Sequence, residues 1–333
     1  MELGNLTEFG YGLNRPECVL THESGLVFVP DWAETGGICV IGPDEQCTKL
    51  VANANPGTFR PNGIALEPGG HFLVAHLGDK AGGVLELRPN GDLRALVTHA
   101  NGAPLPPTNF VFRDVYGKIW LTVSTVKQPR AQDYRKHAAT GFIAVAEPGQ
   151  TDARIVADGL GYTNECVIDY ANNVLYVNET FTRKLSRFDV SEDGTLTNRI
   201  TVCRFGEGIY PDGLALDENG DIWIASIVSN SIVKVKHDDG SQSLILDDSD
   251  PALVQAAETA YQHDQLSSNH LSVTSNLTTL KHTSSLAFGG ANLDQVYFGN
   301  LADSRIHRAK SNVNGSALPH WQYHLGHLES LLL

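Results

Sequence analysis

Six polar residues recur at one position of an internal repeat, and their types could bind a cation. Each lies eight positions before the Gly or Asn of a turn between two runs of alternating apolar residues. The six residues are Glu17, Asn62, Asn109, Asn164, Asp212 and Ser284. Carboxylate and amide oxygens without His or Cys form a hard-oxygen set, which suits Ca²⁺, Mg²⁺ or Mn²⁺, with Zn²⁺ or Fe²⁺ as alternatives.

The clearest copy of the repeat covers residues 210–226. It predicts a strand with Leu214 and Leu216 on one face, a hairpin turn at Asn219-Gly220 and a return strand that begins at Ile222. Successive opening positions are 45, 47, 55, 48 and 72 residues apart. Periods in the forties built from short strands are typical of propeller blades. The sequence therefore predicts an all-β fold, a six-bladed β-propeller with four-stranded antiparallel blades, as a single domain over residues 1–333.

The predicted blades cover about residues 15–53, 60–98, 107–158, 162–203, 210–247 and 283–325. The long last interval contains an insertion, 248–282, in which Asp250 is a predicted N-cap and Pro251 the first residue of a short helix ending near His263. We expect this helix to pack outside the ring. Residues 1–14 are candidates for a strand that fastens the last blade. The tail around Trp321–Tyr323 is expected to complete the outer strand of that blade.

The innermost strands of a propeller all run the same way along the channel, so the six opening residues should meet at one mouth. Two carboxylates crowded there would repel each other unless they were protonated or neutralised by a cation. The simpler alternative is that Asn and Asp at strand starts form Asx-turns in a hydrated polar channel. The joint pattern of six oxygen-bearing residues favours the metal site.

Composition limits the partners and the compartment. The formal net charge is −14, with 38 acidic and 24 basic residues, which disfavours nucleic acids and anionic membranes as partners. The five cysteines form no C-x-x-C pair, which favours packed thiols in a reducing compartment. The first residues show neither a basic region nor an apolar run, and no apolar stretch reaches transmembrane length. We therefore expect a cytoplasmic protein, monomer or homodimer, that acts on a small molecule.

Two motifs carry a resemblance to a known family. Pro211-Asp212-Gly213 followed by Asn219-Gly220 is the stronger motif, and Arg60-Pro61-Asn62-Gly63 is the second. Here the chain resembles the senescence marker protein, gluconolactonase and luciferin-regenerating enzyme family, over about residues 16–309. Members are six-bladed propellers that bind one axial divalent cation, and many hydrolyse lactones. The resemblance implies one divalent cation, Ca²⁺ first, held by Glu17, Asn109, Asn164 and Asp212.

The chain departs from the family pattern near these residues. It has Thr108-Asn109-Phe110 where members often have Pro-Asn-Asp, and Thr163-Asn164-Glu165 where they often have Pro-Asn-Gly. Pro107 stands where sugar-lactone members often place an Arg. These departures favour an aliphatic or aromatic lactone over a sugar-acid lactone as the substrate.

The resemblance implies a hydrolase that opens a lactone with metal-activated water, Asp212 being both a ligand and the general base. The predicted substrate-binding residues are Asn62, Asn109, Arg135 and Ser284. Arg135 belongs to the polar segment 124–140, which could cover the mouth as a lid and offer cations to a carboxylate, or could be a solvated basic loop.

Three alternative functions remain open from the sequence. A phosphotriester hydrolase could use the same metal site, and a ligand-binding propeller would perform no reaction. A strictosidine-synthase-like propeller would use a catalytic Glu without a metal.

Overall fold

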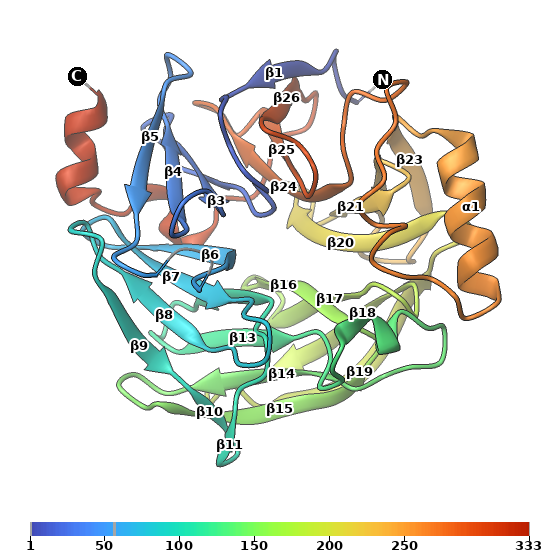
Figure 1. The fold of residues 1–333 in the computed structure, drawn as a ribbon, viewed down its shortest axis with the longest axis horizontal. Coiled ribbons are helices and arrows are strands. Elements are labelled where there is room, and N and C mark those ends of the chain that lie inside the picture. Colours follow the sequence, from blue (N-terminus) through green and yellow to red (C-terminus); the bar gives the residue numbers. More distant parts are fainter. Residues whose placement is uncertain (1, 56–57, 333) are drawn as a thin grey trace.

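The computed structural model describes residues 2–55 and 58–332, and these residues form six sheets around one axis (Figure 1). The innermost strand of each blade contacts inner strands of its two neighbours, which closes the ring. Apolar side chains of neighbouring blades pack against each other in layers between the blades. Trp120 and Trp223, which are among the largest fully buried side chains, belong to two of these layers. The prediction of a six-bladed β-propeller is confirmed.

The strands of each blade follow one another from the axis to the rim. Blades one and two are β2 (Leu20–Thr21), β3 (Val27–Asp31), β4 (Gly37–Ile41) and β5 (Cys47–Val51), then β6 (Pro61–Glu67), β7 (His71–His76), β8 (Val84–Leu87) and β9 (Leu93–Val97). Blades three and four are β12 (Phe110–Arg113), β13 (Ile119–Val123), β14 (Gly141–Ala146) and β15 (Asp152–Leu160), then β16 (Thr163–Asp169), β17 (Val174–Glu179), β18 (Lys184–Val190) and β19 (Leu196–Arg204). Blades five and six are β20 (Ile209–Leu216), β21 (Ile222–Val228), β22 (Ser231–Val235) and β23 (Gln242–Asp247), then β24 (Thr283–Gly289), β25 (Gln295–Asn300), β26 (Ile306–Lys310) and β1 (Thr7–Phe9).

The N-terminal segment closes the ring, as the sequence suggested. Strand β1 pairs antiparallel with β26, with Phe9 opposite Ile306 (Figure 1). The prediction that the tail around Trp321–Tyr323 forms the outer strand of blade six is wrong. Residues Pro319–Gln322 form a 3₁₀ helix, η2, which contacts β6, and Gly326–Leu332 form another, η3. Pro319 has no amide hydrogen to donate to a ladder, and β1 already occupies that sheet edge.

Blade three carries two strands more than the predicted four. Strand β10 (His99–Ala100) pairs parallel with β15, and β11 (Ala103–Pro104) pairs antiparallel with β10. Asn101 and Gly102 join them with φ values of 48° and 79°, which are typical of a two-residue hairpin turn. This short hairpin lies in the interval that the predicted boundaries left between blades two and three.

The insertion contains the predicted helix, α1 (Pro251–Gln262), at the edge of the ring beside blade five (Figure 1). The Asp250 side chain accepts a hydrogen bond from the Ala252 amide at 2.9 Å, so it caps the helix as expected. The segment 124–140 holds the remaining short helix, η1 (Arg130–Asp133), a 3₁₀ turn. In the described residues all five cysteines are free thiols, and no helix has the length and hydropathy needed to cross a membrane.

Replacing Phe9 by Ala tests the ring closure. Phe9 is 1% exposed and packs edge-on against Tyr297, so Phe9→Ala should lower the free energy of unfolding by about 3–5 kcal/mol in chemical denaturation. Tyr11→Ala is the matched control, because Tyr11 is 50% exposed on the same segment; its loss should stay below about 1 kcal/mol. Equal small losses from both variants would show that β1 does not stabilise the ring.

Candidate metal centre

Backbone irregularities set the positions of the opening residues. The pairing register of four inner strands shifts at these residues, between Pro61 and Ile64, Thr163 and Cys166, Pro211 and Leu214, and Thr283 and Ser285. Such bulges bend a strand and re-aim its side chains. A Cβ at Gly213 would lie 2.6 Å from the Ser284 carbonyl oxygen, so only glycine fits where β20 lies against β24.

Asn62 links the opening residues of the first three blades. Its Nδ2 donates to Glu17 Oε1 at 2.8 Å, to the Asn109 carbonyl oxygen at 2.9 Å and to Asn109 Oδ1 at 3.1 Å. Arg15 Nη1 donates to Asn62 Oδ1 at 2.9 Å and to Glu17 Oε2 at 2.8 Å. These contacts form one hydrogen-bond network, in which both the amide nitrogen and the amide oxygen of Asn62 are bonded to neighbouring residues.

Two hydroxyls fix the orientation of the amides in blades three and four. Asn109 Nδ2 donates to Ser124 Oγ at 2.7 Å, and Asn164 Nδ2 donates to Thr180 Oγ1 at 3.1 Å. Each amide oxygen therefore points away from its hydroxyl partner. Asn164 Oδ1 and Asp212 Oδ1 are buried and accept no hydrogen bond. Buried oxygens without a donor are costly, and a cation is the kind of partner that would satisfy both.

Negative charge is crowded around these oxygens. Burial raises the pKa of Asp212 well above its usual range, and the Glu17 and Glu165 carboxylates raise it further, whereas Arg15 and Arg130 oppose the rise. Burial, followed by the charge of Glu17, raises the pKa of Glu165 to about 8. Among residues 2–55 and 58–332, no three His, Cys, Asp or Glu side chains form a cluster that could hold a metal. A cation here would therefore depend on amide oxygens as well as on carboxylates.

The predicted site residues divide into two groups. Five of them line one pocket at the mouth of the channel, namely Glu17, Asn62, Asn109, Asn164 and Asp212. Ser284 is buried outside this lining and donates to the Glu17 carbonyl oxygen at 2.8 Å. Arg135 is also outside the lining, because Nη1 donates to the Tyr134 and Leu266 carbonyl oxygens, both at 2.9 Å. The structure thus does not bring these two side chains to the pocket.

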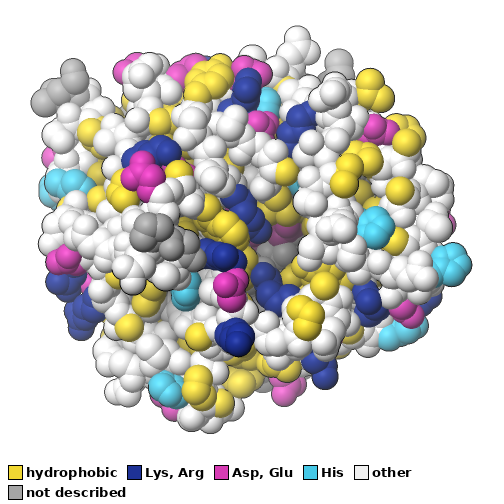
Figure 2. All heavy atoms as spheres, viewed as in Figure 1, with side chains coloured by type: hydrophobic (Ala, Val, Ile, Leu, Met, Phe, Trp, Pro, Cys, Tyr) yellow, Lys and Arg dark blue, Asp and Glu magenta, His cyan; other side chains and the backbone are white. Residues whose placement is uncertain are grey.

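The pocket contains about 820 Å³ of space, part of which is open to solvent. Figure 2 shows a hollow near the centre of the viewed face, in which Lys and Arg side chains gather beside hydrophobic ones. Tyr134, Tyr162 and Phe181 form part of the wall, with Phe181 4.4 Å from Tyr134 and 4.7 Å from Tyr162 between ring centroids. The remaining apolar lining residues are Leu77, Ile227, Leu271, Leu301 and Ala302.

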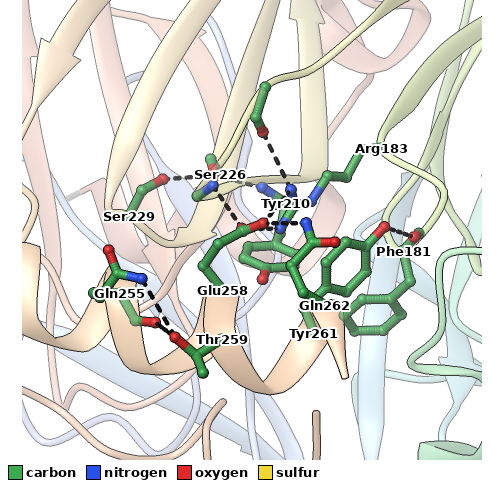
Figure 3. Close-up of polar contacts among 12 residues, drawn as sticks. Phe181, Arg183, Tyr210, Ser226, Ser229, Gln255, Glu258, Thr259, Tyr261 and Gln262 are labelled. Carbon is green, nitrogen blue, oxygen red and sulfur yellow. Dashed lines mark hydrogen bonds and ion pairs between the residues drawn. The ribbon is translucent and has the colours of Figure 1, made fainter. Parts of the chain in front are cut away.

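Helix α1 is fastened beside this wall by a buried ion pair. Arg183 and Glu258 pair with each other, and the Glu258 carboxylate also accepts from the Gly208 amide at 3.1 Å (Figure 3). The Arg183 guanidinium lies 4.3 Å from the Tyr210 ring centroid and 4.0 Å from that of Tyr261. The Tyr261 hydroxyl donates to the Phe181 carbonyl oxygen at 2.7 Å (Figure 3). The insertion is thereby tied to a residue that lines the pocket.

Three residues of the site were not identified from the sequence: Arg15, Ser124 and Thr180. Arg130 was expected only as part of the segment 124–140, whose cations could meet a carboxylate, and it lines the pocket. Ser124 and Thr180 stand at equivalent places, 15 and 16 residues after the Asn that each one orients (109 to 124, 164 to 180). A search for a second polar position at the end of each second strand would have found them. Arg15 lies outside the repeat register, so no periodic signal marks it.

The fold and the mouth define a six-bladed propeller with an oxygen-lined axial site. The model of the SMP-30/Gluconolactonase/LRE-like region matches residues 16–247, and the chain belongs to this family. The match and the sheet order together confirm the family that the sequence motifs indicated.

Individual relatives are distant. A Bacillus subtilis (strain 168) protein named as a sugar lactone lactonase is 25% identical over 126 residues, which is 37% of this chain and 39% of that protein. The Arabidopsis thaliana protein strictosidine synthase-like 4 is 26% identical over 223 residues, 65% of this chain and 57% of that protein. The chain thus spans less than two thirds of either relative. The structure of regucalcin, a calcium-binding protein from Agrobacterium tumefaciens, superposes with a TM-score of 0.63 at 16% identity, covering 95% of both chains, and shows the same fold.

Removing the Glu258 carboxylate tests whether the ion pair fastens the insertion. Glu258→Ala would leave Arg183 buried without its partner, so we expect the free energy of unfolding to fall by about 3–5 kcal/mol. Glu8→Ala is the control, because Glu8 pairs with Arg305 at the surface with 48% of its side chain exposed; its loss should stay below about 1 kcal/mol. A Glu258→Ala loss as small as that of the control would contradict the assignment.

Proposed function

We propose that this protein is a lactonase that opens a cyclic ester at the channel mouth, with Asp212 as the general base. The observation that supports this most is the pair of buried oxygens, Asn164 Oδ1 and Asp212 Oδ1, which have no hydrogen-bond donor. They lie at equivalent positions of neighbouring blades and line the same pocket. Membership of the SMP-30/gluconolactonase/LRE-like family supports the ester-opening reaction.

The donor set fits one divalent cation. Glu17, Asn109, Asn164 and Asp212 would hold it, since they offer only carboxylate and amide oxygens, which favours Ca²⁺ among the common ions. When bound, the cation supplies positive charge that polarises the ester carbonyl and favours the ionised form of Asp212. The likeness to the calcium-binding protein regucalcin agrees with this choice of ion.

The side chains around the pocket have separate tasks. Asp212 accepts the proton of the attacking water, and Arg15 and Arg130 favour its carboxylate form because their charges lower its pKa. Asn62, Ser124 and Thr180 hold the oxygen-bearing residues in place through their hydrogen bonds, so the oxygens are oriented before substrate arrives.

The pocket wall bears on the type of lactone. The rings of Tyr134, Tyr162 and Phe181 offer apolar surface beside the oxygens, where a sugar ring would need polar partners. An aliphatic or aromatic lactone therefore fits this wall better than a sugar-acid lactone. The cytoplasmic location and the monomeric or dimeric state stay predictions from the sequence.

Asp212→Asn tests the role of the general base. Asn keeps an oxygen and nearly the same volume but loses most of the basicity, so kcat for an aliphatic or aromatic lactone should fall by about 10²-fold or more. The measurement is steady-state hydrolysis of γ-butyrolactone, dihydrocoumarin and glucono-δ-lactone in saturating Ca²⁺. Asp238→Asn, an exposed Asp in the same blade, should keep wild-type activity.

Two outcomes would count against the proposal. Full lactonase activity in Asp212→Asn would remove the role of Asp212 while leaving the reaction in place. If the calcium-saturated wild type opened no lactone but hydrolysed phosphotriesters, the reaction itself would have to be reassigned.

A further inference from the structure

Arg130 lines the pocket and forms no ion pair among the described residues, although its charge acts on Asp212 at longer range. Its one hydrogen bond there is long, from Nη2 to Ser124 Oγ at 3.3 Å, and its guanidinium lies 5.4 Å from the Tyr162 ring centroid. Its Nε is buried and donates to no acceptor. A guanidinium with unused donors beside an aromatic ring is well suited to pairing with an anion.

Arg15, the other arginine of the pocket, is differently placed. Its Nη1 is already bonded to Glu17 and Asn62, and its guanidinium lies 4.4 Å from the Trp32 ring centroid. Arg15 therefore holds the hydrogen-bond network of Glu17 and Asn62 in place, whereas Arg130 is available to bind a ligand. Because one guanidinium is available, a group with a single negative charge is the matching ligand.

The charge balance of the pocket points the same way. The charged lining residues are Arg15, Arg130, Glu17 and Asp212, whose formal charges sum to zero. This step rests on the proposed function: a divalent cation held there would leave two positive charges in excess. Such a pocket attracts anions and disfavours cationic substrates.

The wall indicates what the rest of the ligand looks like. Tyr134 and Tyr162, whose ring centroids are 5.3 Å apart, pack with Phe181, and the Arg130 guanidinium lies beside the Tyr162 ring. An apolar body would cover these rings while its acidic group reached the guanidinium. A neutral sugar would neither cover the aromatic rings with apolar surface nor pair with the Arg130 guanidinium.

We propose that the pocket selects lactones that bear a carboxylate on an aliphatic or aromatic body, and that Arg130 binds this carboxylate. Arg130 is then the specificity-determining residue of the site, and it lies on η1 of the segment 124–140, outside the repeated strand positions. Opening such a lactone yields a dicarboxylate, so the product carries one negative charge more than the substrate.

Direct binding tests this without any reaction. The probes are 3-phenylpropanoate and its neutral isostere 3-phenylpropanamide, titrated by calorimetry into metal-free and calcium-loaded protein. We expect the wild type to bind the carboxylate at least about tenfold more tightly than the amide, as a charge-assisted hydrogen bond allows. Arg130→Gln should lower the ratio of the carboxylate affinity to the amide affinity by about 10- to 100-fold, in the metal-free protein as well.

Lys127→Gln is the matched control. Lys127 lies three residues before Arg130 on the same segment and is exposed, so its loss removes one positive charge at a distance from the pocket. The binding ratio should be retained in this variant. Arg130→Lys keeps the charge but loses the planar fork, so its ratio should fall several-fold and lie between those of wild type and Arg130→Gln.

Three results would overturn the inference: equal binding of both probes by the wild type, an unchanged ratio in Arg130→Gln, or an equal drop in Lys127→Gln. If Arg130→Gln fails to fold in a thermal melt, Arg130→Lys carries the test, and an unchanged ratio there overturns the inference.

Hydrolysis separates this inference from the proposed function. The substrates are 5-oxotetrahydrofuran-2-carboxylate and its carboxamide, compared by kcat/KM in wild type and Arg130→Gln. Hydrolysis of both without preference would leave the lactonase proposal standing and refute the role of Arg130. A carboxylate preference in binding without hydrolysis of any lactone would refute the lactonase proposal and leave the carboxylate site standing.

Discussion

Buried oxygen atoms at the axis are the constraint on which the site depends. Asp212 lies near the carboxyl groups of Glu17 and Glu165, and burial together with these charges raises its pKa far above the ordinary range. Its Oδ1 and that of Asn164 accept no hydrogen bond. Such an arrangement is unfavourable without a partner for these oxygens, because each buried acceptor loses its hydrogen bonds to water. It becomes favourable when positive charge stands among the oxygens, as Arg15 and Arg130 provide in part.

The rest of the molecule holds these oxygens together against their repulsion. Strand β1 closes the ring on β26, so the inner strands cannot move apart without separating a paired edge. The insertion is tied to blade four through Arg183 and Glu258 and to the pocket wall through Tyr261 and Phe181. The part of the chain that lies outside the repeat therefore supports the wall of the pocket, while the repeat itself supplies the oxygens.

The repeat made much of the fold and of the oxygen set predictable. An eight-residue register in six copies specifies six inner strands around one axis. Five of the six opening residues, Asn164 and Asp212 among them, share a pocket as expected, whereas Ser284 bonds the Glu17 carbonyl oxygen instead. Features without a period were not predictable: the tail around Trp321 resembles a strand locally, but the edge it would need is taken by β1. Arg135 and Arg130 lie in the same segment, and only tertiary contacts show that Arg135 bonds backbone carbonyls while Arg130 lines the pocket.

A crystal structure from protein grown in CaCl₂, with data collected where calcium scatters anomalously, tests the central claim most directly. The account predicts one anomalous peak per chain on the channel axis, about 2.3–2.6 Å from oxygens of Glu17, Asn109, Asn164 and Asp212. The buried oxygens Asn164 Oδ1 and Asp212 Oδ1 should both be among these ligands. An axial site without a peak at millimolar calcium, with Asp212 paired instead to Arg15 or Arg130, would contradict it.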